Sequence, residues 1–357
     1  MANQSVEKST DERTNSNSQI DNVTLQKQKL SNYGFDKQEA LHDASYDKFV
    51  SNYLPVLERR KQRWEELVSH SDGASSSLPE GFWEQRKLKR FIRKGIPLEM
   101  RPQLWMTLSG ADAERNNCIG GYKTLCDTPC KPEVLDAIEL DLKRTYPDNK
   151  FFQTAPGSLQ NDLKTVLIAF ANKNPNIGYC QGLNYLAGML MLVLKSNENA
   201  FWLLHTQISK LPEYYTPGMT GLVVDMKVLS ELIAQELPDV HSVFERFDFD
   251  PAMMVTKWFV CWFLETLPVE TALRVWDCLF HEGSKILFRC AVAVIAMNRS
   301  KFLKCQNIIH LTDVFKDIQS DSKIIECHVF MEKVFQLSGS MPSKRIQDLR
   351  RKHTVQS

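Results

Sequence analysis

The sequence predicts a large all-α protein. From about Trp83 to Phe335, apolar residues recur at intervals of three and four along most of the chain, which is the spacing of one helix face. No segment alternates strictly between apolar and polar residues around Asn-Gly or Asp-Gly turns, as β-hairpins would. The chain has 357 residues, enough to bury a sizeable core in one large domain or two ordinary ones.

The N-terminal part of the chain is predicted to lie outside this core. Residues 1–35 are predicted to be a disordered N-terminus, because 1–32 are rich in polar residues and contain no aromatic residue. Residues 36–80 are predicted to be a helical extension followed by a linker. The helical pattern is interrupted near Pro55, and the polar stretch HSDGASSSLPEG at 70–81 is typical of a long loop.

The main domain is placed at residues 83–335, and its first clear helical pattern starts at Leu135. That helix must end by Tyr146, because Pro147 disfavours the α conformation in the residue before it. A second apolar stripe follows Ser158, which is a predicted N-cap.

The later helices of the domain follow from similar patterns. The run LNYLAGMLMLVL at 183–194 predicts a buried helix that is too short to span a bilayer. Pro268 suits a helix start, and the last helix is expected to emerge into solvent at Asn298. Further helices are predicted at 222–233, 257–267, 270–280 and 286–303.

Charge and cysteine content narrow the classes of function. Lys and Arg total 44 against 43 Asp and Glu, so the net charge does not indicate a nucleic-acid or membrane-surface protein. The N-terminus lacks the apolar core of a secretory signal, and the nine cysteines show no CxxC pairs. We therefore expect a cytoplasmic protein with reduced thiols and no metal site. Residues 340–357 are predicted to be a basic C-terminal tail.

The motifs of common enzyme classes are missing from the sequence. It contains no GxxxxGK[ST], GxGxxG, Gly-x-Ser-x-Gly or HExxH pattern. A self-contained hydrolase or nucleotide-binding enzyme is therefore not predicted, and we expect no cofactor of the chain's own.

Two short stretches carry polar residues in unusual settings. In IELDLKRTYPDN at 138–149, Arg144 lies in the last helical turn and shares a face with Asp141. In NKNPNIGYCQGLNYLAG at 172–188, Gln181 lies on a glycine-hinged loop before the buried helix. Such an arginine can cap a helix end or point at a partner. Amide side chains in such a loop usually cap the helix or bridge loops.

Taken together, the two stretches resemble the TBC domain. The matching patterns are IxxDxxRTxP from Ile138 and YxQGxN from Tyr179. Other signatures follow in the family's order, namely KGIP at 94–97, RPQLW at 101–105, KWFVCWF at 257–263, LP at 267–268 and RVWDCLFHEG at 274–283. The resemblance covers roughly residues 90–335, and PVETALRVWDCLFHEGSKI is similar to the growth hormone-regulated TBC subgroup.

The resemblance implies a GTPase-activating protein for Rab small GTPases, with an all-helical fold. It implies that Arg144 acts as an arginine finger and Gln181 as a glutamine finger, both supplied in trans to a GTP-bound Rab. The GTP and Mg²⁺ would belong to the Rab, and the chain alone would turn over nothing. Contact with a membrane would be indirect, through the lipidated Rab, and the process served would be vesicle trafficking.

The other motif residues are interpreted as support for the two fingers. The residues expected to hold the finger loops are Asp141, Thr145, Tyr179, Gly182 and Asn184. The residues expected to be structural are Arg101, Trp105, Trp258, Trp276 and Asp277. The three tryptophans are expected in the core, and Arg101 and Asp277 are expected to be partners.

Two other functions are compatible with parts of the pattern. A non-catalytic Rab-binding scaffold on the same fold is the main alternative, although both fingers are present. The third possibility is a helical adaptor with no GTPase partner, in which the polar residues of both stretches only cap helix ends. It leaves unexplained why the family's signatures occur in the family's order. One position departs from the family's pattern, since Thr165 stands where many members carry an arginine, and Lys164 faces another direction on the helix.

Overall fold

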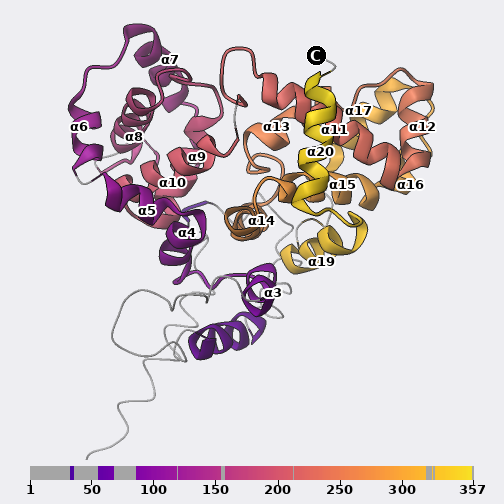
Figure 1. The fold of residues 1–357 in the computed structure, drawn as a ribbon, viewed down its shortest axis with the longest axis horizontal. Coiled ribbons are helices and arrows are strands. Elements are labelled where there is room, and N and C mark those ends of the chain that lie inside the picture. The colour runs from indigo at the N-terminus through magenta and orange to yellow at the C-terminus, as the bar shows by residue number, and fades with distance from the viewer. Residues whose placement is uncertain are drawn as a thin grey trace, which may run out of the picture.

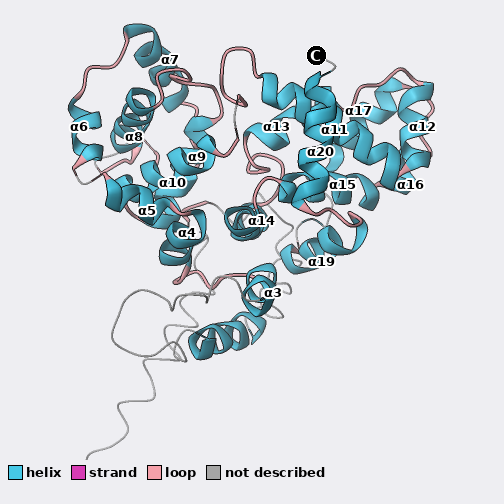
Figure 2. Ribbon diagram, in the orientation of Figure 1, coloured by secondary structure: helices cyan, strands magenta, loops and turns pink. Residues whose placement is uncertain are grey.

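The structure, a computed structural model, describes residues 33–35, 55–67, 86–118, 120–153, 157–211, 213–318, 324 and 326–355. These residues form helices joined by loops and turns, with no β-strand among them (Figure 2). The predicted all-α class is confirmed. Of the two predicted N-terminal regions, the structure describes only residues 33–35 and the helix at 55–67. The predicted domain limits of 83–335 stay a prediction.

A first group of helices packs together on the left in Figure 1. Helices α8, α9 and α10 pack against one another, α4 and α5 pack on α10, and α6 and α7 pack on α8. The group consists of α4 (Arg101–Ser109), α5 (Ala111–Asn117), α6 (Gly121–Asp127), α7 (Pro132–Leu142), α8 (Gln160–Lys173), α9 (Leu183–Leu194) and α10 (Asn197–Ser209).

A second group lies on the right in the same view, with the C-terminal helix packed along α11 (Figure 1). Its members are α11 (Thr220–Glu236), α12 (Pro238–Arg246), α13 (Ala252–Val260), α14 (Val269–Glu282), α15 (Lys285–Met297), α16 (Arg299–Phe302), α17 (Ile308–Asp317), α19 (Cys327–Leu337) and α20 (Ser343–Val355). Helix α14 also packs against α4, so it joins the two groups. The predicted basic tail therefore contains a helix that packs on the rest of the protein.

The N-terminal extension is attached through a buried tryptophan. Helix 55–67 places Trp64 against α3 (Arg86–Lys94), where its ring meets that of Phe91 edge to face at 5.6 Å. The Trp64 Nε1–H donates to the carbonyl oxygen of Gly95 at 2.9 Å. Trp64 is 1% exposed, so this contact fixes the extension to the domain.

A buried ion pair joins α4 to α14. Arg101 Nε and Nη2 donate to the two carboxylate oxygens of Asp277 at 3.1 and 3.2 Å. The Trp105 Nε1–H donates to Asp277 Oδ1 at 2.8 Å, and the backbone N–H of Ile96 donates to Oδ2 at 3.1 Å. Arg101 and Asp277, expected to be partners, are both buried. Burial raises the pKa of Asp277 although Arg101 and Arg274 lower it.

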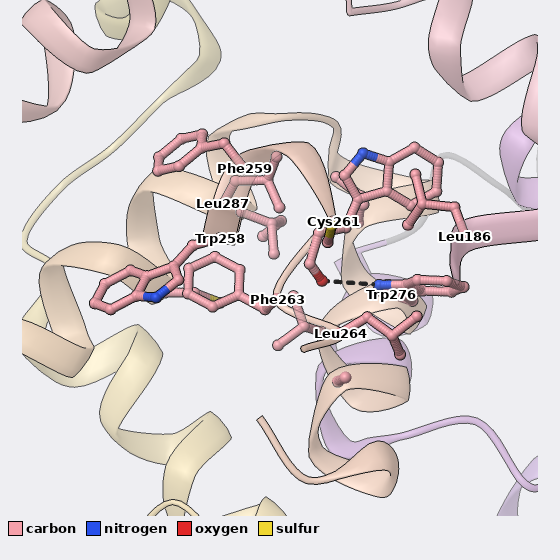
Figure 3. Packing of buried hydrophobic residues seen from close by; sticks show 14 of the residues in the cluster. Leu186, Trp258, Phe259, Cys261, Phe263, Leu264, Trp276 and Leu287 are labelled. Carbon is pink, nitrogen blue, oxygen red and sulfur yellow. Dashed lines mark hydrogen bonds between the residues drawn. The ribbon is translucent and has the colours of Figure 1, made fainter. Parts of the chain in front are cut away.

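The aromatic block at 257–267 differs from the prediction of a helix. Helix α13 ends at Val260, and the chain then turns through Trp262 and Phe263, whose φ angles are +47° and +66°. Both side chains are fully buried, so tertiary packing overrides local helix preference here. The Trp276 Nε1–H donates to the Trp262 carbonyl at 3.0 Å, and Figure 3 shows this bond beside Cys261. Trp105, Trp258 and Trp276 all lie among the buried residues of the core.

Two further predictions about helices are wrong in detail. Ser158 is not the N-cap, because α8 starts at Gln160 and Leu159 precedes it; the Ser158 hydroxyl accepts from the Gln160 backbone N–H at 3.3 Å. The helix predicted at 286–303 breaks at Asn298, which is fully buried and does not emerge into solvent. Its side-chain amide donates to the Val294 carbonyl at 3.0 Å and competes with the backbone ladder.

Helix α9 is buried along nearly its whole length, as predicted, since only Tyr185 among its twelve residues is partly exposed. None of the helices in the described residues is both long and apolar enough to cross a membrane.

Candidate functional site

Arg144 lies just beyond the end of α7. The helix ends at Leu142, so the prediction that Arg144 occupies the last helical turn is corrected by two residues. The backbone N–H groups of Arg144 and Thr145 donate three residues back, to Asp141 and Leu142, and this tightens the helix end. Tyr146, before Pro147, has a φ of +50°. The chain therefore turns sharply here and presents Arg144 at the surface.

The Arg144 side chain is held along one edge only. Its Nε lies 2.8 Å from Asp141 Oδ1, with the arginine side chain 55% exposed and the aspartate 5% exposed. The Nε also donates to the Leu140 carbonyl at 3.4 Å. In the part of the chain that the structure describes, neither terminal guanidinium nitrogen has a hydrogen-bond partner. Asp141 therefore holds the Nε edge of Arg144, and its orienting role stays a prediction.

The loop that carries Gln181 connects α8 to α9. Gly178 and Gly182 have φ angles of +62° and +106°, which glycine adopts at little cost. Gly182 is the N-cap residue of α9, so Gln181 precedes the helix directly. Its side chain is exposed and has no hydrogen-bond partner among the described residues.

Hydrogen bonds join the Gln181 loop to the Arg144 segment. The Tyr179 hydroxyl donates to Asp141 Oδ2 at 2.5 Å. The Asn184 amide donates to Thr145 Oγ1 at 2.8 Å, and Asn184 Oδ1 accepts from the Gly182 N–H at 3.0 Å. These bonds are consistent with the predicted supporting roles and bring both predicted finger segments to one place.

Further contacts bury the base of this arrangement. The Thr145 hydroxyl donates to the Asp141 carbonyl at 2.6 Å, as a helix-end contact would. Asp141, Thr145 and Asn184 are all nearly or fully buried. Burial, followed by the hydrogen bond and charge of Asp141, raises the pKa of Tyr179 well above its usual value. Tyr179 therefore stays a neutral hydrogen-bond donor to Asp141.

Tyr185 supports the site although sequence reasoning did not single it out. Its hydroxyl donates to the Arg144 carbonyl at 3.3 Å, and its own carbonyl accepts from the Tyr146 hydroxyl at 2.8 Å. The only available signal was its place directly after Asn184.

Thr165, which departs from the family's pattern, lies on an exposed face of α8, and its hydroxyl donates to the Asn161 carbonyl at 3.0 Å. The neighbouring Lys164 forms an ion pair with Glu139 at 2.5 Å.

The site offers a permanently charged guanidinium and a neutral amide, both at the surface. Such groups bind anions and orient water, but they provide no nucleophile. In the described residues no group of three or more His, Cys, Asp and Glu side chains could hold a metal ion.

Comparison with known proteins gives consistent results. Residues 98–303 match the family model for the Rab-GTPase-TBC domain, called RabGAP-TBC. The chain is 42% identical to human growth hormone-regulated TBC protein 1 over 324 residues, which cover 90% of this chain and 94% of that protein. It is 38% identical to growth hormone-regulated TBC protein 6 of Caenorhabditis elegans over 305 residues, 85% of each chain.

Solved structures agree with these sequence matches. The flagellar RabGAP TBC domain of Chlamydomonas superposes with a TM-score of 0.68 at 28% identity, over 87% of this chain and all of that one. The Ypt/Rab-GAP domain of Gyp1p superposes with a TM-score of 0.62 at 18% identity, over 79% of this chain and 98% of that one, and it supports the fold alone. The family model covers more than half of the chain, and relatives above 30% identity align along most of it. The chain therefore belongs to the RabGAP-TBC family, and the resemblance to growth hormone-regulated TBC proteins is confirmed.

Proposed function

We propose that the protein accelerates GTP hydrolysis on one or more Rab GTPases by supplying Arg144 and Gln181 in trans. The observation that carries the proposal is that both side chains are exposed while the segments bearing them are joined through Asp141 and Asn184. The family relationship supports a Rab as the partner. The GTP and Mg²⁺ are the partner's own, and the chain needs no cofactor.

Arg144 is proposed to neutralise charge that develops on the phosphates during hydrolysis. Its guanidinium is planar and permanently charged, and the contacts with Asp141 and the Leu140 carbonyl involve Nε. Phosphoryl transfer gains most from such positioned charge. Because Asp141 holds one edge in advance, less side-chain freedom is lost when the phosphate binds.

Gln181 is proposed to orient the attacking water in the place of the Rab's own glutamine. An amide can donate to a phosphate oxygen and accept from water at the same time. The hydrogen bonds of Asn184 to Gly182 and Thr145 fix the loop that presents it. Recruitment to membranes would then come through the lipidated Rab.

The test is GTP hydrolysis by a panel of purified Rabs with wild-type protein, Arg144→Ala, Arg144→Lys and Gln181→Ala. An arginine finger contributes about 10³–10⁵-fold in rate, so Arg144→Ala should lose nearly all acceleration. Arg144→Lys should lose most of it, because a point charge does not replace the planar fork. Gln181→Ala should also be inactive, while a Rab lacking its own catalytic glutamine should still respond.

Arg299→Ala is the matched control. Arg299 pairs with Asp239 at 2.6 Å and its side chain is 56% exposed, close to the value for Arg144, but it lies on α16. It should keep full activity. Rab binding without acceleration by the wild type would contradict the proposal and favour a scaffold. Equal losses of activity in Arg299→Ala and Arg144→Ala would also contradict it.

A further inference from the structure

The C-terminal helix α20 lies outside the span that matches the family model, and none of the roles above uses it. It packs along α11 (Figure 1). Its cationic side chains Arg345, Arg350 and Lys352 pair with acidic residues of α11. Most of these pairs lie near the surface. One of them differs, because it continues into the core.

That pair is Arg350 with Asp225. Arg350 Nε and Nη2 donate to the two carboxylate oxygens of Asp225 at 2.7 and 2.6 Å, and Nη2 also donates to Ser284 Oγ at 3.0 Å. Asp225 is 1% exposed. Its Oδ2 also accepts from the Tyr214 hydroxyl. Arg350 of α20 and Tyr214 thus donate to the same buried carboxylate. Loss of either donor would leave part of its hydrogen-bonding capacity unsatisfied.

Tyr214 and Tyr215 lie in the irregular segment that joins α10 to α11. Glu213 and Met219 in this segment have φ angles of +62° and +46°, so no regular helix fixes its position. Tyr214 and Tyr215 are each 2% exposed. The Tyr215 hydroxyl donates to the Val260 carbonyl at 2.9 Å, and the segment is therefore held at Asp225 on one side and at the end of α13 on the other.

The end of α13 lies directly under the Gln181 loop. A Cβ atom placed on Gly182 would be 3.0 Å from Val260 Cγ1 and 3.2 Å from Cys261 Sγ. The turn that follows includes the two left-handed residues Trp262 and Phe263. Backbone of this kind keeps its shape only while its surroundings impose it. Figure 3 shows the packing of Cys261 and Phe263 around this turn.

We propose that Arg350 of α20 is a positioning residue for the glutamine finger. The connection runs from Arg350 through Asp225 to Tyr214, then from the adjacent Tyr215 to Val260, and from Val260 to Gly182 beside Gln181. The inference rests on the proposed function of Gln181. It makes the C-terminal helix part of the activating unit, although that helix touches neither finger.

The same helix provides a matched control. Arg345 donates to Glu236 Oε1 at 2.7 Å and to Gln235 Oε1 at 2.6 Å. These bonds also hold α20 to α11, but they do not reach Tyr214 or Tyr215. Arg350→Met and Arg345→Met therefore both loosen the docking of α20, and only the first removes support from the Gln181 loop.

The experiment measures kcat and KM for Rab-bound GTP hydrolysis, together with Tm, on the full chain. Arg350→Met should lower kcat by about tenfold with little change in KM, because a shift of under 1 Å at a positioned group costs one to two orders of magnitude. Arg345→Met should stay within about twofold of wild type at a comparable loss of Tm. Arg350→Lys, which keeps the charge, should recover part of the rate. Equal kcat for the two methionine variants would overturn the inference.

Two further readouts cover the case in which Arg350→Met folds poorly or no Rab responds. Tyr215→Phe removes one hydroxyl, so it should lower kcat severalfold at nearly unchanged Tm. Amide hydrogen exchange in residues 178–183 should be faster in Arg350→Met and Tyr215→Phe than in Arg345→Met. If Tyr215→Phe matches wild type in both readouts, the inference is wrong.

Gln181→Ala separates this inference from the proposed function. If that variant retains acceleration, the glutamine role itself fails. If it is inactive while Tyr215→Phe and Arg350→Met behave as wild type, the glutamine role stands and the positioning role of α20 fails.

Discussion

Two arginine–aspartate pairs in this molecule have similar chemistry and different surroundings. Arg101 lies 3.1 Å from Asp277, with side chains 2% and 0% exposed. Arg144 lies 2.8 Å from Asp141, with side chains 55% and 5% exposed. In both pairs the carboxylate is buried, so the difference lies in the arginine. One is enclosed by the fold, and the other reaches out of it.

The number of occupied donors follows from this difference. Arg101 donates to Asp277, to both carboxylate oxygens of Glu270 and to the Tyr33 hydroxyl. Arg144 uses only Nε among the described residues. A guanidinium with all its edges occupied holds helices together, whereas one with an open edge can bind a partner's anion. Exposure and donor occupancy thus distinguish Arg101 from Arg144, which sequence motifs alone do not.

The largest effect should come from removing the enclosed arginine. Arg101→Met leaves Asp277 buried without its main partner, and breaking a buried ion pair in this way costs about 3–5 kcal/mol. Arg144→Met breaks an exposed pair and should cost under about 1 kcal/mol. Urea denaturation of both variants measures the two free energies of unfolding. Similar losses of unfolding free energy in the two variants would contradict the structural role of Arg101 relative to Arg144. If Arg144→Met still accelerated GTP hydrolysis by the Rab, the proposed role of Arg144 would be contradicted.

A third pair is intermediate and gives a pH dependence. Arg93 donates to both carboxylate oxygens of Glu282 at 2.6 and 2.8 Å, with side chains 30% and 2% exposed. Lys89 lies 3.1 Å from the same carboxylate. Burial alone would raise the pKa of Glu282, but the hydrogen bond and charge of Arg93, with the charge of Lys89, lower it from 4.5 to about 2.

A lowered folded-state pKa means that the ionised form stabilises the fold. The contribution of Glu282 is complete above pH 4.5 and is lost as the pH falls toward about 2. It amounts to about 3 kcal/mol. We expect the free energy of unfolding of the wild type to fall more steeply over this range than that of Glu282→Gln. Parallel curves for the two proteins would show that Glu282 has the same pKa in the folded and unfolded states.

The sequence allowed the helical class and the residues of the Arg101–Asp277 and Arg144–Asp141 pairs to be predicted, because periodicity and family motifs report on these directly. It did not predict the turn at Trp262 and Phe263, where burial of two aromatic side chains decides the backbone conformation. It missed Tyr185 and Arg350, since their contacts join residues 41 and 125 positions apart. Such long-range contacts leave no local pattern in a single sequence.

The substitutions with the smallest expected effect should distinguish the two pairs most cleanly. Each of them removes a single hydroxyl oxygen that contacts one of the pairs. Tyr179 donates to Asp141 at 2.5 Å, and Tyr33 accepts from Arg101 at 2.9 Å. Each substitution by Phe should cost about 1 kcal/mol. For Tyr179→Phe the cost should appear in the activation free energy, and for Tyr33→Phe it should appear in the free energy of unfolding. Tyr179→Phe frees the carboxylate that orients Arg144, so it should lower kcat about fivefold with little change in Tm.

Tyr33→Phe should instead lower the free energy of unfolding and leave kcat unchanged, since Arg101 touches neither finger. Urea denaturation of each variant, and GTP hydrolysis by a Rab stimulated with the same preparations, measure both quantities. If Tyr179→Phe reduces stability and not kcat, then Asp141 serves the fold just as Asp277 does. The exposure of Arg144 would in that case reflect only its position at a helix end.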